Sequence, residues 1–314
     1  MRGRKIAIVG SGSIGLFYGC KLALAGCHVH FLMRSGFETA SKSGIRIHSE
    51  TGSVHIANPR IAKSPAEIGP CDGVIVAVKA TSNPALPDLL PPLLGDRTWI
   101  LTLQNGLGNE EFCASHFGAG RILGGLCFVC LTRRNPVEVD YVGRGTLSVG
   151  EFQGPPQDRT RRLVEAFLAG GVEARLVQHL LEERWRKLVW NIPFNGLCTI
   201  ERAGVDRILG DPALLRECEC LMDEVRAIAA ADGHEIPPDY ADRQIARTRP
   251  MGPYRPSTLV DADAGNPLEI EPIWGEPLRR ARSLGVKTPH LASLYKKLDS
   301  RTSSQRQRRS PKDS

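Results

Sequence analysis

Residues 5–15, Lys5-Ile6-Ala7-Ile8-Val9-Gly10-Ser11-Gly12-Ser13-Ile14-Gly15, form a short apolar run that leads directly into the pattern G-x-G-x-x-G. The apolar run predicts a buried β-strand, and residues 16–25 after it predict a helix. A strand, this glycine pattern and a helix, in that order, are the fingerprint of a dinucleotide-binding unit. The first glycine permits a tight turn, the second lets the backbone approach a pyrophosphate, and the third lets helix and strand pack closely.

The residue after the second predicted strand indicates which dinucleotide binds. The helix ends at Gly26, residues 28–33 predict a strand, and Arg34 follows. NAD-binding sites usually have Asp or Glu here, whereas a guanidinium suits the 2′-phosphate of NADP. The alternative, a glycine-rich turn in another α/β protein, is disfavoured by the strand, the helix and Arg34 around the motif. The sequence therefore predicts an NADPH site at Gly10, Ser11, Gly12, Ser13, Ile14, Gly15 and Arg34.

Composition places the chain among globular proteins with two domains. It has 314 residues, of which 41% are hydrophobic and 24% charged, values ordinary for a globular protein. We expect no membrane helix, because no stretch approaches 18 uncharged apolar residues, and no signal peptide, because a strand begins at residue 5. Nine scattered cysteines indicate a reducing compartment, so we expect a cytoplasmic protein.

Basic residues concentrate at the carboxyl end. Five lie between residues 301 and 312, in a segment rich in Ser, Gln and Arg that has no apolar residues from residue 300 onward. Such a composition predicts a disordered tail. A basic tail can bind nucleic acid, but a solvated terminus is the simpler interpretation. Since the rest of the chain has no basic stripe, we expect no nucleic-acid partner.

Strand and helix patterns alternate through the first half. Buried strands are predicted at 73–78, 99–103 and 122–131, helices at 109–117 and 157–169, and a last strand at 172–177. Two hairpins are expected as well. One joins 45–47 to 54–56 around Gly52, and the other joins 137–141 to 146–149 across Gly143 and Gly145. This order predicts an α/β fold with a mostly parallel, doubly wound sheet.

The second half is helical and nearly free of strand patterns. Asp211-Pro212 predicts a capped helix that runs to about Ala231, and residues 271–284 predict another that Gly285 closes. The predicted organisation has three parts: an NADP-binding Rossmann domain at 1–178, an all-helical substrate domain at 179–298, and a disordered basic tail at 299–314.

Polar side chains at strand ends are the first candidates for chemistry, because ligands of open α/β sheets bind at the carboxyl ends of strands. Lys79 follows the strand at 73–78, and Gln104-Asn105-Gly106 follows the strand at 99–103. An ammonium and an amide placed there suit a cofactor phosphate and the nicotinamide or substrate. Ordinary loop residues remain the alternative for both.

Lys187, Asn191 and Asn195 form the second candidate group. Their spacing of four puts them on one face of a helix that is otherwise apolar. Such groups are costly to bury without partners, so this face is a candidate wall of a substrate cleft. A solvated stripe is the alternative.

Four cysteines, in Cys127-x-x-Cys130 and Cys218-x-Cys220, are a candidate zinc site. The first pair lies in a predicted strand, where positions i and i+3 point to opposite faces, and the second lies in mid-helix. Core thiols explain both pairs, and the histidines make no metal spacing, so no metal is expected.

Taken together, these motifs resemble the ketopantoate reductase family (2-dehydropantoate 2-reductase) over nearly the whole chain to residue 298. The likeness is carried by five features: the glycine motif with Arg34, Val78-Lys79-Ala80, Gln104-Asn105-Gly106, Lys187-x-x-x-Asn191-x-x-x-Asn195, and Pro256 to Asp261 leading to Pro267-Leu268-Glu269-Ile270. The resemblance implies NADPH-dependent reduction of a 2-oxo acid to a 2-hydroxy acid, and it makes a homodimer an expectation.

The resemblance also implies residue roles. Lys187 becomes the catalytic acid, Asn105 and Glu269 act at the cofactor and the reacting centre, and Lys79 contacts the cofactor. Substrate contacts fall to Asn191, Asn195 and Ser257 beside Lys187. An ammonium there agrees with the chemistry, because hydride addition to a ketone builds negative charge on its oxygen.

Three departures from the family pattern lie on the substrate side: Val205 at an asparagine position, Thr258, and Leu268. We expect 2-dehydropantoate as the leading substrate in pantothenate biosynthesis. The alternatives are a paralogous reductase of a bulkier or more apolar 2-oxo acid and a non-catalytic NADPH-binding sensor.

Overall fold

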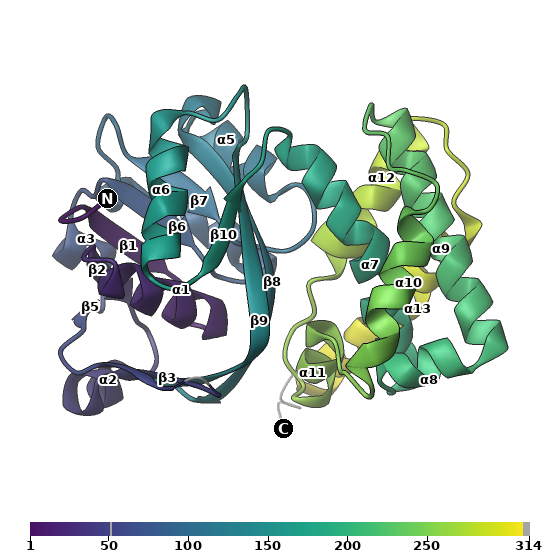
Figure 1. Ribbon diagram of the computed structural model, residues 1–314, viewed down its shortest axis with the longest axis horizontal. Coiled ribbons are helices and arrows are strands. Elements are labelled where there is room, and N and C mark those ends of the chain that lie inside the picture. Colours follow the sequence, from purple (N-terminus) through teal and green to yellow (C-terminus); the bar gives the residue numbers. More distant parts are fainter. Residues whose placement is uncertain (51, 310–314) are drawn as a thin grey trace. The chain divides into compact units, whose positions relative to one another are not determined.

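A computed structural model describes residues 1–50 and 52–309. The chain divides into two compact units, which Figure 1 shows (the placement of one relative to the other is not determined). The first comprises residues 1–105 and 109–180, and the second comprises 106–108 and the chain from 181 onward. The sequence places a boundary after residue 178 and gives no sign that 106–108 belong to the helical unit.

The first unit is built on one sheet, with strands ordered β4-β3-β9-β8-β7-β6-β1-β2-β5 and β10 beside β9. The run from β5 to β8 is parallel throughout. Its strands are β1 (Lys5–Val9), β2 (His28–Leu32), β5 (Arg60–Ala62), β6 (Gly73–Val76), β7 (Trp99–Thr102) and β8 (Ile122–Asn135). This arrangement confirms the Rossmann-like, mostly parallel sheet.

The other edge makes the sheet mixed. β9 (Glu138–Glu151) runs antiparallel to β8, while β3 (Ile45–Ser49) and β10 (Glu173–Leu176) run parallel to β9. β4 (Val54–Ile56) pairs antiparallel with β3, so the first predicted hairpin is confirmed.

The second predicted hairpin is wrong. Residues 138–151 form one continuous strand, and the chain reverses before it, where Asn135 Oδ1 accepts a hydrogen bond of 2.9 Å from the Val137 amide. Gly143, with φ of 76°, lies within the strand at a shift of register opposite residues 128–130. A bulge needs a residue that tolerates positive φ just as a turn does, so Gly143 marks a bulge within β9 and not the turn of a hairpin.

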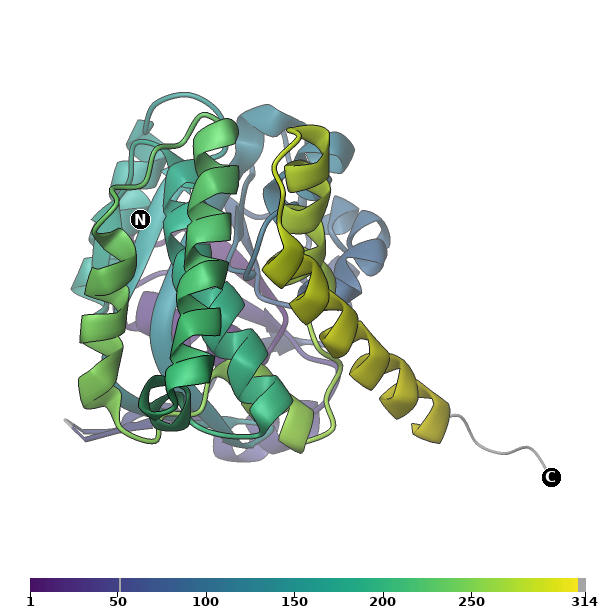
Figure 2. The same ribbon diagram turned by 90° about the vertical axis from the view of Figure 1, so that its right-hand side faces the viewer.

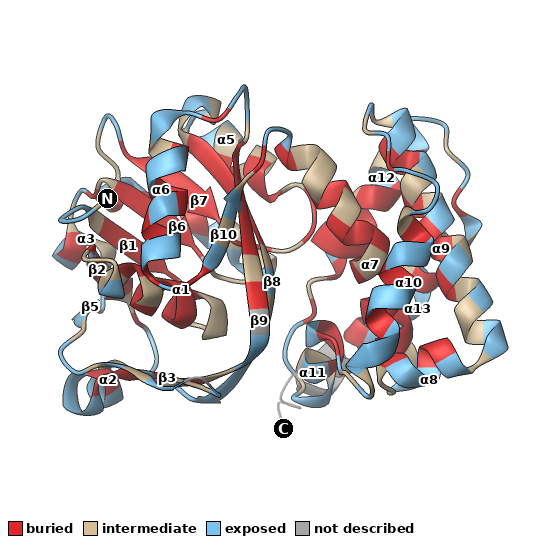
Figure 3. Cartoon of the chain, viewed as in Figure 1, coloured by how far each residue is buried: buried red, intermediate tan, exposed pale blue. Residues whose placement is uncertain are grey.

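Helices cover both faces of this sheet. Along β1, Ile6 and Ile8 belong to one core cluster while Ala7 and Val9 belong to another. The first cluster includes residues of α1 (Ser13–Leu24) and α6 (Asp158–Ala169), and the second includes Cys113 of α5 (Asn109–Phe117). The central strands are accordingly buried (Figure 3), as a doubly wound sheet requires. The shorter helices are α2 (Phe37–Ser43), α3 (Pro65–Ile68) and α4 (Leu86–Leu89), and η1 (Ala80–Ala85), η2 (Pro91–Leu93) and η3 (Ala119–Arg121) are 3₁₀ turns.

The second unit is built from helices joined by loops and has no strand among its described residues, which confirms the predicted class. Its helices are α7 (Leu180–Glu201), α8 (Val205–Gly210), α9 (Pro212–Ala231), α10 (Tyr240–Thr248), α11 (Ser257–Asp263), α12 (Glu276–Ser283) and α13 (Pro289–Arg309). η4 (Arg249–Met251) is a 3₁₀ turn, and η5 (Glu271–Gly275) is a π-helical turn ahead of α12. None of the helices in the described part of the chain has the length and apolarity needed to cross a bilayer.

The carboxyl-terminal helix is longer than the sequence predicts. The sequence predicts disorder from residue 299, yet α13 continues to Arg309, and Figure 2 shows it as an unbroken yellow helix. Leu294 and Leu298 anchor it in the core, and the Arg301 guanidinium donates to the carbonyl of Thr199. Arg and Gln are good helix formers, so an anchored helix propagates through them at little cost. Residues 310–314 of the predicted tail lie outside the described residues.

The capped start of α9 gives a first prediction. Asp211 accepts hydrogen bonds from the amides of Ala213 (2.9 Å) and Leu214 (3.2 Å). Asp211→Ala should therefore lower the free energy of unfolding by about 1 kcal/mol, measured by urea denaturation of the full chain. Asp211→Asn keeps the acceptor and should change it by less than about 0.5 kcal/mol. Equal losses in both variants would contradict the capping role.

Candidate active site

One edge of the first unit's sheet gathers four of the predicted residues. β1, β2, β6 and β7 are parallel neighbours, so their carboxyl ends share an edge. Gly10 follows β1, Arg34 lies two residues beyond β2, Lys79 lies three beyond β6, and Asn105 lies three beyond β7. Arg34 is exposed, while Lys79 and Asn105 are partly buried.

The glycine loop at this edge leaves no room for side chains at two of its three glycines. A Cβ on Gly10, which has φ of 108°, would lie 2.5 Å from the Val78 amide nitrogen. A Cβ on Gly15 would lie 1.9 Å from the Gly10 carbonyl oxygen. A Cβ on Gly12, the N-cap of α1, would meet nothing within 4 Å.

This geometry matches the roles expected of the three glycines. The outer two permit close contact between backbone segments, and the middle one leaves open space in front of the first turn of α1. Backbone N–H groups at a helix start are unsatisfied within the helix and favour an anion. The loop can therefore hold a pyrophosphate with backbone donors alone.

A chain of amide side chains supports Asn105. Thr102 Oγ1 donates to Gln104 Oε1 (3.0 Å), and Gln104 Nε2 donates to Asn83 Oδ1 (2.7 Å). Asn83 Nδ2 donates to Asn109 Oδ1 (3.0 Å), and Asn109 Nδ2 donates to the Asn105 carbonyl (2.9 Å). The chain therefore fixes the backbone at Asn105.

Asn83 and Asn109 were missed by the sequence analysis. Each looks like an ordinary polar residue in its own segment, Asn83 in the 3₁₀ turn η1 and Asn109 at the start of α5. Their relation becomes visible only when η1 and α5 are packed together.

In the second unit, α7 presents the polar face that the sequence predicts. Lys187, Asn191 and Asn195 are 6%, 5% and 3% exposed. Their burial excludes the solvated stripe that was the alternative. α7 also continues as one helix through Pro193. Amide and ammonium groups can donate hydrogen bonds to the oxygens of a ligand, so this face is suited to hold a polar ligand.

The segments that carry Ser257 and Glu269 belong to the same helical unit. Ser257 is the exposed first residue of α11, and Glu269 is a partly buried residue two positions before η5. Leu259, two residues after Ser257, and Leu268, directly before Glu269, belong to the core cluster that contains Ile192 of α7. π-turns such as η5 are frequent at functional sites.

Residues 106–108, directly after Asn105, are bound to η5. The Leu107 amide donates to the Pro272 carbonyl at 2.8 Å. Gly106 has φ of 84°, and a Cβ there would lie 2.2 Å from the Pro272 carbonyl oxygen. The glycine of Gln104-Asn105-Gly106 is thus required by close packing and not only by a turn.

The thiols show no arrangement for metal binding. Within residues 1–50 and 52–309, no three His, Cys, Asp or Glu side chains are grouped to hold a metal ion. Cys127 and Cys130 lie in β8, opposite Leu147 and Val142 of β9. Burial raises the pKa of the Cys113 thiol to about 12, so that thiol stays protonated and weakly reactive at neutral pH.

A cavity of about 540 Å³ lies elsewhere in the first unit. Its lining includes Thr98, just before β7, and Arg121, just before β8, together with Phe117 and Arg159. These residues precede the strands, so the cavity is at the amino edge of the sheet. The candidate residues follow the strands, at the carboxyl edge, where ligands of such sheets bind.

Comparison with known proteins supports the motif-based resemblance. Residues 6–154 match the family described as ketopantoate reductase PanE/ApbA, and residues 179–301 match its C-terminal counterpart. The chain belongs to the ketopantoate reductase family. It is therefore an oxidoreductase, and the resemblance inferred from its motifs is confirmed.

Individual relatives match over almost the entire chain. A 2-dehydropantoate 2-reductase of Nostoc sp. is 37% identical over 303 residues, which cover 95% of each chain. The crystal structure of 2-dehydropantoate 2-reductase from Geobacter metallireducens is 40% identical with a TM-score of 0.92, covering 94% of this chain and 99% of that one. The corresponding structure from Methylococcus capsulatus is 34% identical with a TM-score of 0.88, covering 95% and 98%.

The glycine loop gives a prediction about stability. Gly15→Ala should lower the free energy of unfolding by about 2 kcal/mol, because its Cβ clashes with a carbonyl that cannot move independently of β1. Gly12→Ala should leave it within about 0.5 kcal/mol, because φ of −79° suits alanine and the space is open. Thermal unfolding of both variants measures the difference, and equal destabilisation would refute this account of the loop.

Proposed function

We propose that the protein reduces the 2-oxo group of 2-dehydropantoate to a hydroxyl, with NADPH as hydride donor, a step of pantothenate biosynthesis. The observation that carries the proposal is the buried Lys187–Asn191–Asn195 face in a chain 37% identical to a 2-dehydropantoate 2-reductase. Bound NADPH would supply the hydride. The protein's residues would bind and orient the cofactor and the substrate, and would protonate the ketone oxygen.

The cofactor side of the proposal rests on the first unit. The loop Gly10–Gly15 would hold the pyrophosphate through backbone amides, since the position of Gly12 offers open space there. Arg34, exposed beyond β2, would pair with the 2′-phosphate. Lys79 would add a positive charge at the same edge, and Asn105, whose backbone the amide chain fixes, would orient the nicotinamide.

The catalytic side rests on the second unit. Hydride addition makes the ketone oxygen negative, and Lys187 would stabilise that charge and donate the proton from Nζ. Burial strengthens both effects, because water no longer screens the ammonium. Glu269, as part of the catalytic group, would hold the ammonium or the cofactor ribose in place.

The substrate would be held mainly by amides and hydroxyls. Asn191 and Asn195 continue the face of Lys187 along α7, and Ser257 adds an exposed hydroxyl at the start of α11. Such groups pair with the carboxylate and hydroxyl oxygens of a small 2-oxo acid.

A second candidate function is a paralogous reductase of a more apolar 2-oxo acid. Val205 is fully buried in the helical core, and its amide donates to the Tyr254 carbonyl at 3.0 Å. A valine offers no side-chain hydrogen bond at this position, where the family pattern implied by the resemblance has an asparagine. Thr258 and Leu268 are 5% and 4% exposed. Turnover of a panel of 2-oxo acids, measured as NADPH oxidation at 340 nm, separates the two reductase functions.

Substitution of Lys187 tests the catalytic proposal. Lys187→Ala should lower kcat for 2-oxo acid reduction by about 10²–10⁴-fold, since general-acid residues contribute that much. The variant should still bind NADPH, as measured by the fluorescence of the cofactor. Lys287→Ala, which removes an exposed lysine of the same unit, is the matched control and should keep full activity. Unchanged turnover in Lys187→Ala would refute the mechanism and favour a non-catalytic NADPH-binding sensor.

Substitution of Arg34 tests the cofactor. Arg34→Ala should raise KM for NADPH by roughly 10–100-fold, because a charge-assisted pair with the 2′-phosphate is lost. KM for NADH, which lacks that phosphate, should stay within about twofold. Arg60→Ala, an exposed arginine on β5, controls for the general loss of positive charge. A wild-type preference for NADH would overturn the assignment of NADPH.

A further inference from the structure

Three indole N–H groups hold α7 in the helical unit. Trp185 Nε1 donates to Asp232 Oδ2 (2.9 Å), and Trp190 Nε1 donates to Thr248 Oγ1 (2.9 Å). Trp274 Nε1 of η5 donates to the Ile192 carbonyl (3.0 Å). The partners lie on the C-cap of α9, on α10 and on η5, so α7 is tied to three separate elements.

The bond from Trp185 is the most unusual of the three. Trp185 is completely buried, so its N–H needs a partner. That partner is a carboxylate at the C-cap of α9, where the helix dipole disfavours negative charge. Arg280 offsets this cost, because its Nη1 lies 3.2 Å from the same Asp232 oxygen.

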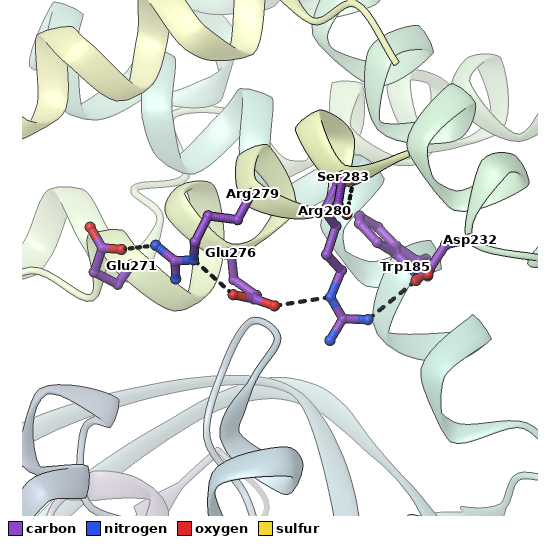
Figure 4. A network of polar contacts seen from close by, with 7 residues as sticks. All are labelled: Trp185, Asp232, Glu271, Glu276, Arg279, Arg280 and Ser283. Atoms are coloured by element: carbon purple, nitrogen blue, oxygen red, sulfur yellow. Dashed lines mark hydrogen bonds and ion pairs between the residues drawn. The ribbon is translucent and has the colours of Figure 1, made fainter. Parts of the chain in front are cut away.

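Arg280 in turn begins a chain of ion pairs that Figure 4 shows. Its Nε lies 3.1 Å from Glu276 Oε1, and Arg279 joins Glu276 (3.0 Å) to Glu271 (2.6 Å). The Arg280 side chain is 17% exposed, whereas that of Arg279 is 55% exposed. Exposed ion pairs contribute little, so the inner end at Asp232 and Trp185 is the part able to fix a position.

Trp185, at the inner end of these ion pairs, lies two residues before Lys187. Two residues correspond to a rotation of about 200° around a helix, so Trp185 and Lys187 point to nearly opposite sides of α7. Fixing the direction of the Trp185 ring therefore fixes the rotation of α7 and, with it, the direction of the Lys187 side chain. A displacement of about 1 Å at a reacting group can cost about 100-fold in rate.

We propose that Trp185 and Asp232 are positioning residues, which set the rotation of α7 and thereby aim Lys187 at the substrate's carbonyl oxygen. This inference rests on the proposed role of Lys187. Arg280 pairs with Asp232 and orients its side chain, so Asp232 Oδ2 at the C-cap of α9 can accept the hydrogen bond from the indole.

The test uses conservative variants of the full-length enzyme. Trp185→Phe keeps an aromatic ring in the core but removes the indole N–H together with part of the ring, whereas Asp232→Ala breaks the same hydrogen bond and leaves the indole in place. The kcat of Trp185→Phe should fall about 10–100-fold, while KM for the 2-oxo acid and for the dinucleotide stays within about twofold. Asp232→Ala should behave in the same way. Asp232→Asn keeps an acceptor oxygen for the indole and should recover most of the lost kcat.

Two controls separate positioning from general stability. Tyr295→Phe removes a 2.6 Å hydrogen bond to Glu271 at the outer end of the same chain and should leave kcat unchanged. Trp185→Phe combined with Asp232→Ala should be no slower than the slower of the two single variants, because both break the same hydrogen bond between the indole and Asp232. The pH dependence of kcat/KM should also shift on its Lys187 limb in Trp185→Phe and not in Tyr295→Phe.

The outcomes are distinguishable. Wild-type kcat in Trp185→Phe and Asp232→Ala, together with an inactive Lys187→Ala, would overturn the positioning role and leave the proposed function intact. Full activity in Lys187→Ala would refute the proposed function itself. If Trp185→Phe and Tyr295→Phe lose kcat equally, and in proportion to the fall in their melting temperatures, the contacts from Trp185 to Tyr295 have a purely structural role. That result would overturn the inference.

Discussion

Close backbone contact at the end of β1 is the constraint on which the first unit depends. Gly10 lies against the backbone of Val78, and Gly15 lies against the carbonyl of Gly10, at distances that exclude any Cβ. These contacts bring the start of α1 to the carboxyl edge of the sheet between β1 and β6. The same edge then receives the ends of β2 and β7 through parallel pairing. One local steric requirement thus decides where a dinucleotide can be bound.

Much of this architecture could be predicted from the sequence, because it depends on local pattern. The alternation in β1 between two core clusters follows from an apolar run with side-chain period two. The capped helix after Asp211 follows from side-chain chemistry within one turn. Gly143 shows where local pattern fails: bulges and turns both need positive φ, and only the pairing of β9 with β8 distinguishes them.

The candidate site was predictable to a different extent in each unit. The spacing of Lys187, Asn191 and Asn195 on α7 identifies a face without any knowledge of tertiary structure. The amide chain through Asn83 and the contact of Gly106 with η5 join segments distant in sequence. Such partners are chosen by packing, and no spacing rule reveals them. The extension of α13 belongs to the same class, since burial of Leu298 makes the following residues helical.

Burial of three polar groups on α7 has an energetic consequence that connects the site with the rest of its unit. An apolar face there would be the more stable choice, because desolvated polar groups cost free energy unless they are paired. A buried polar face can serve a ligand only if its groups stay aimed at that ligand. Trp185, Trp190 and Trp274 each contribute an indole hydrogen bond that joins α7 to another element of its unit. These hydrogen bonds hold α7 in place, and by doing so they hold the polar face that α7 carries.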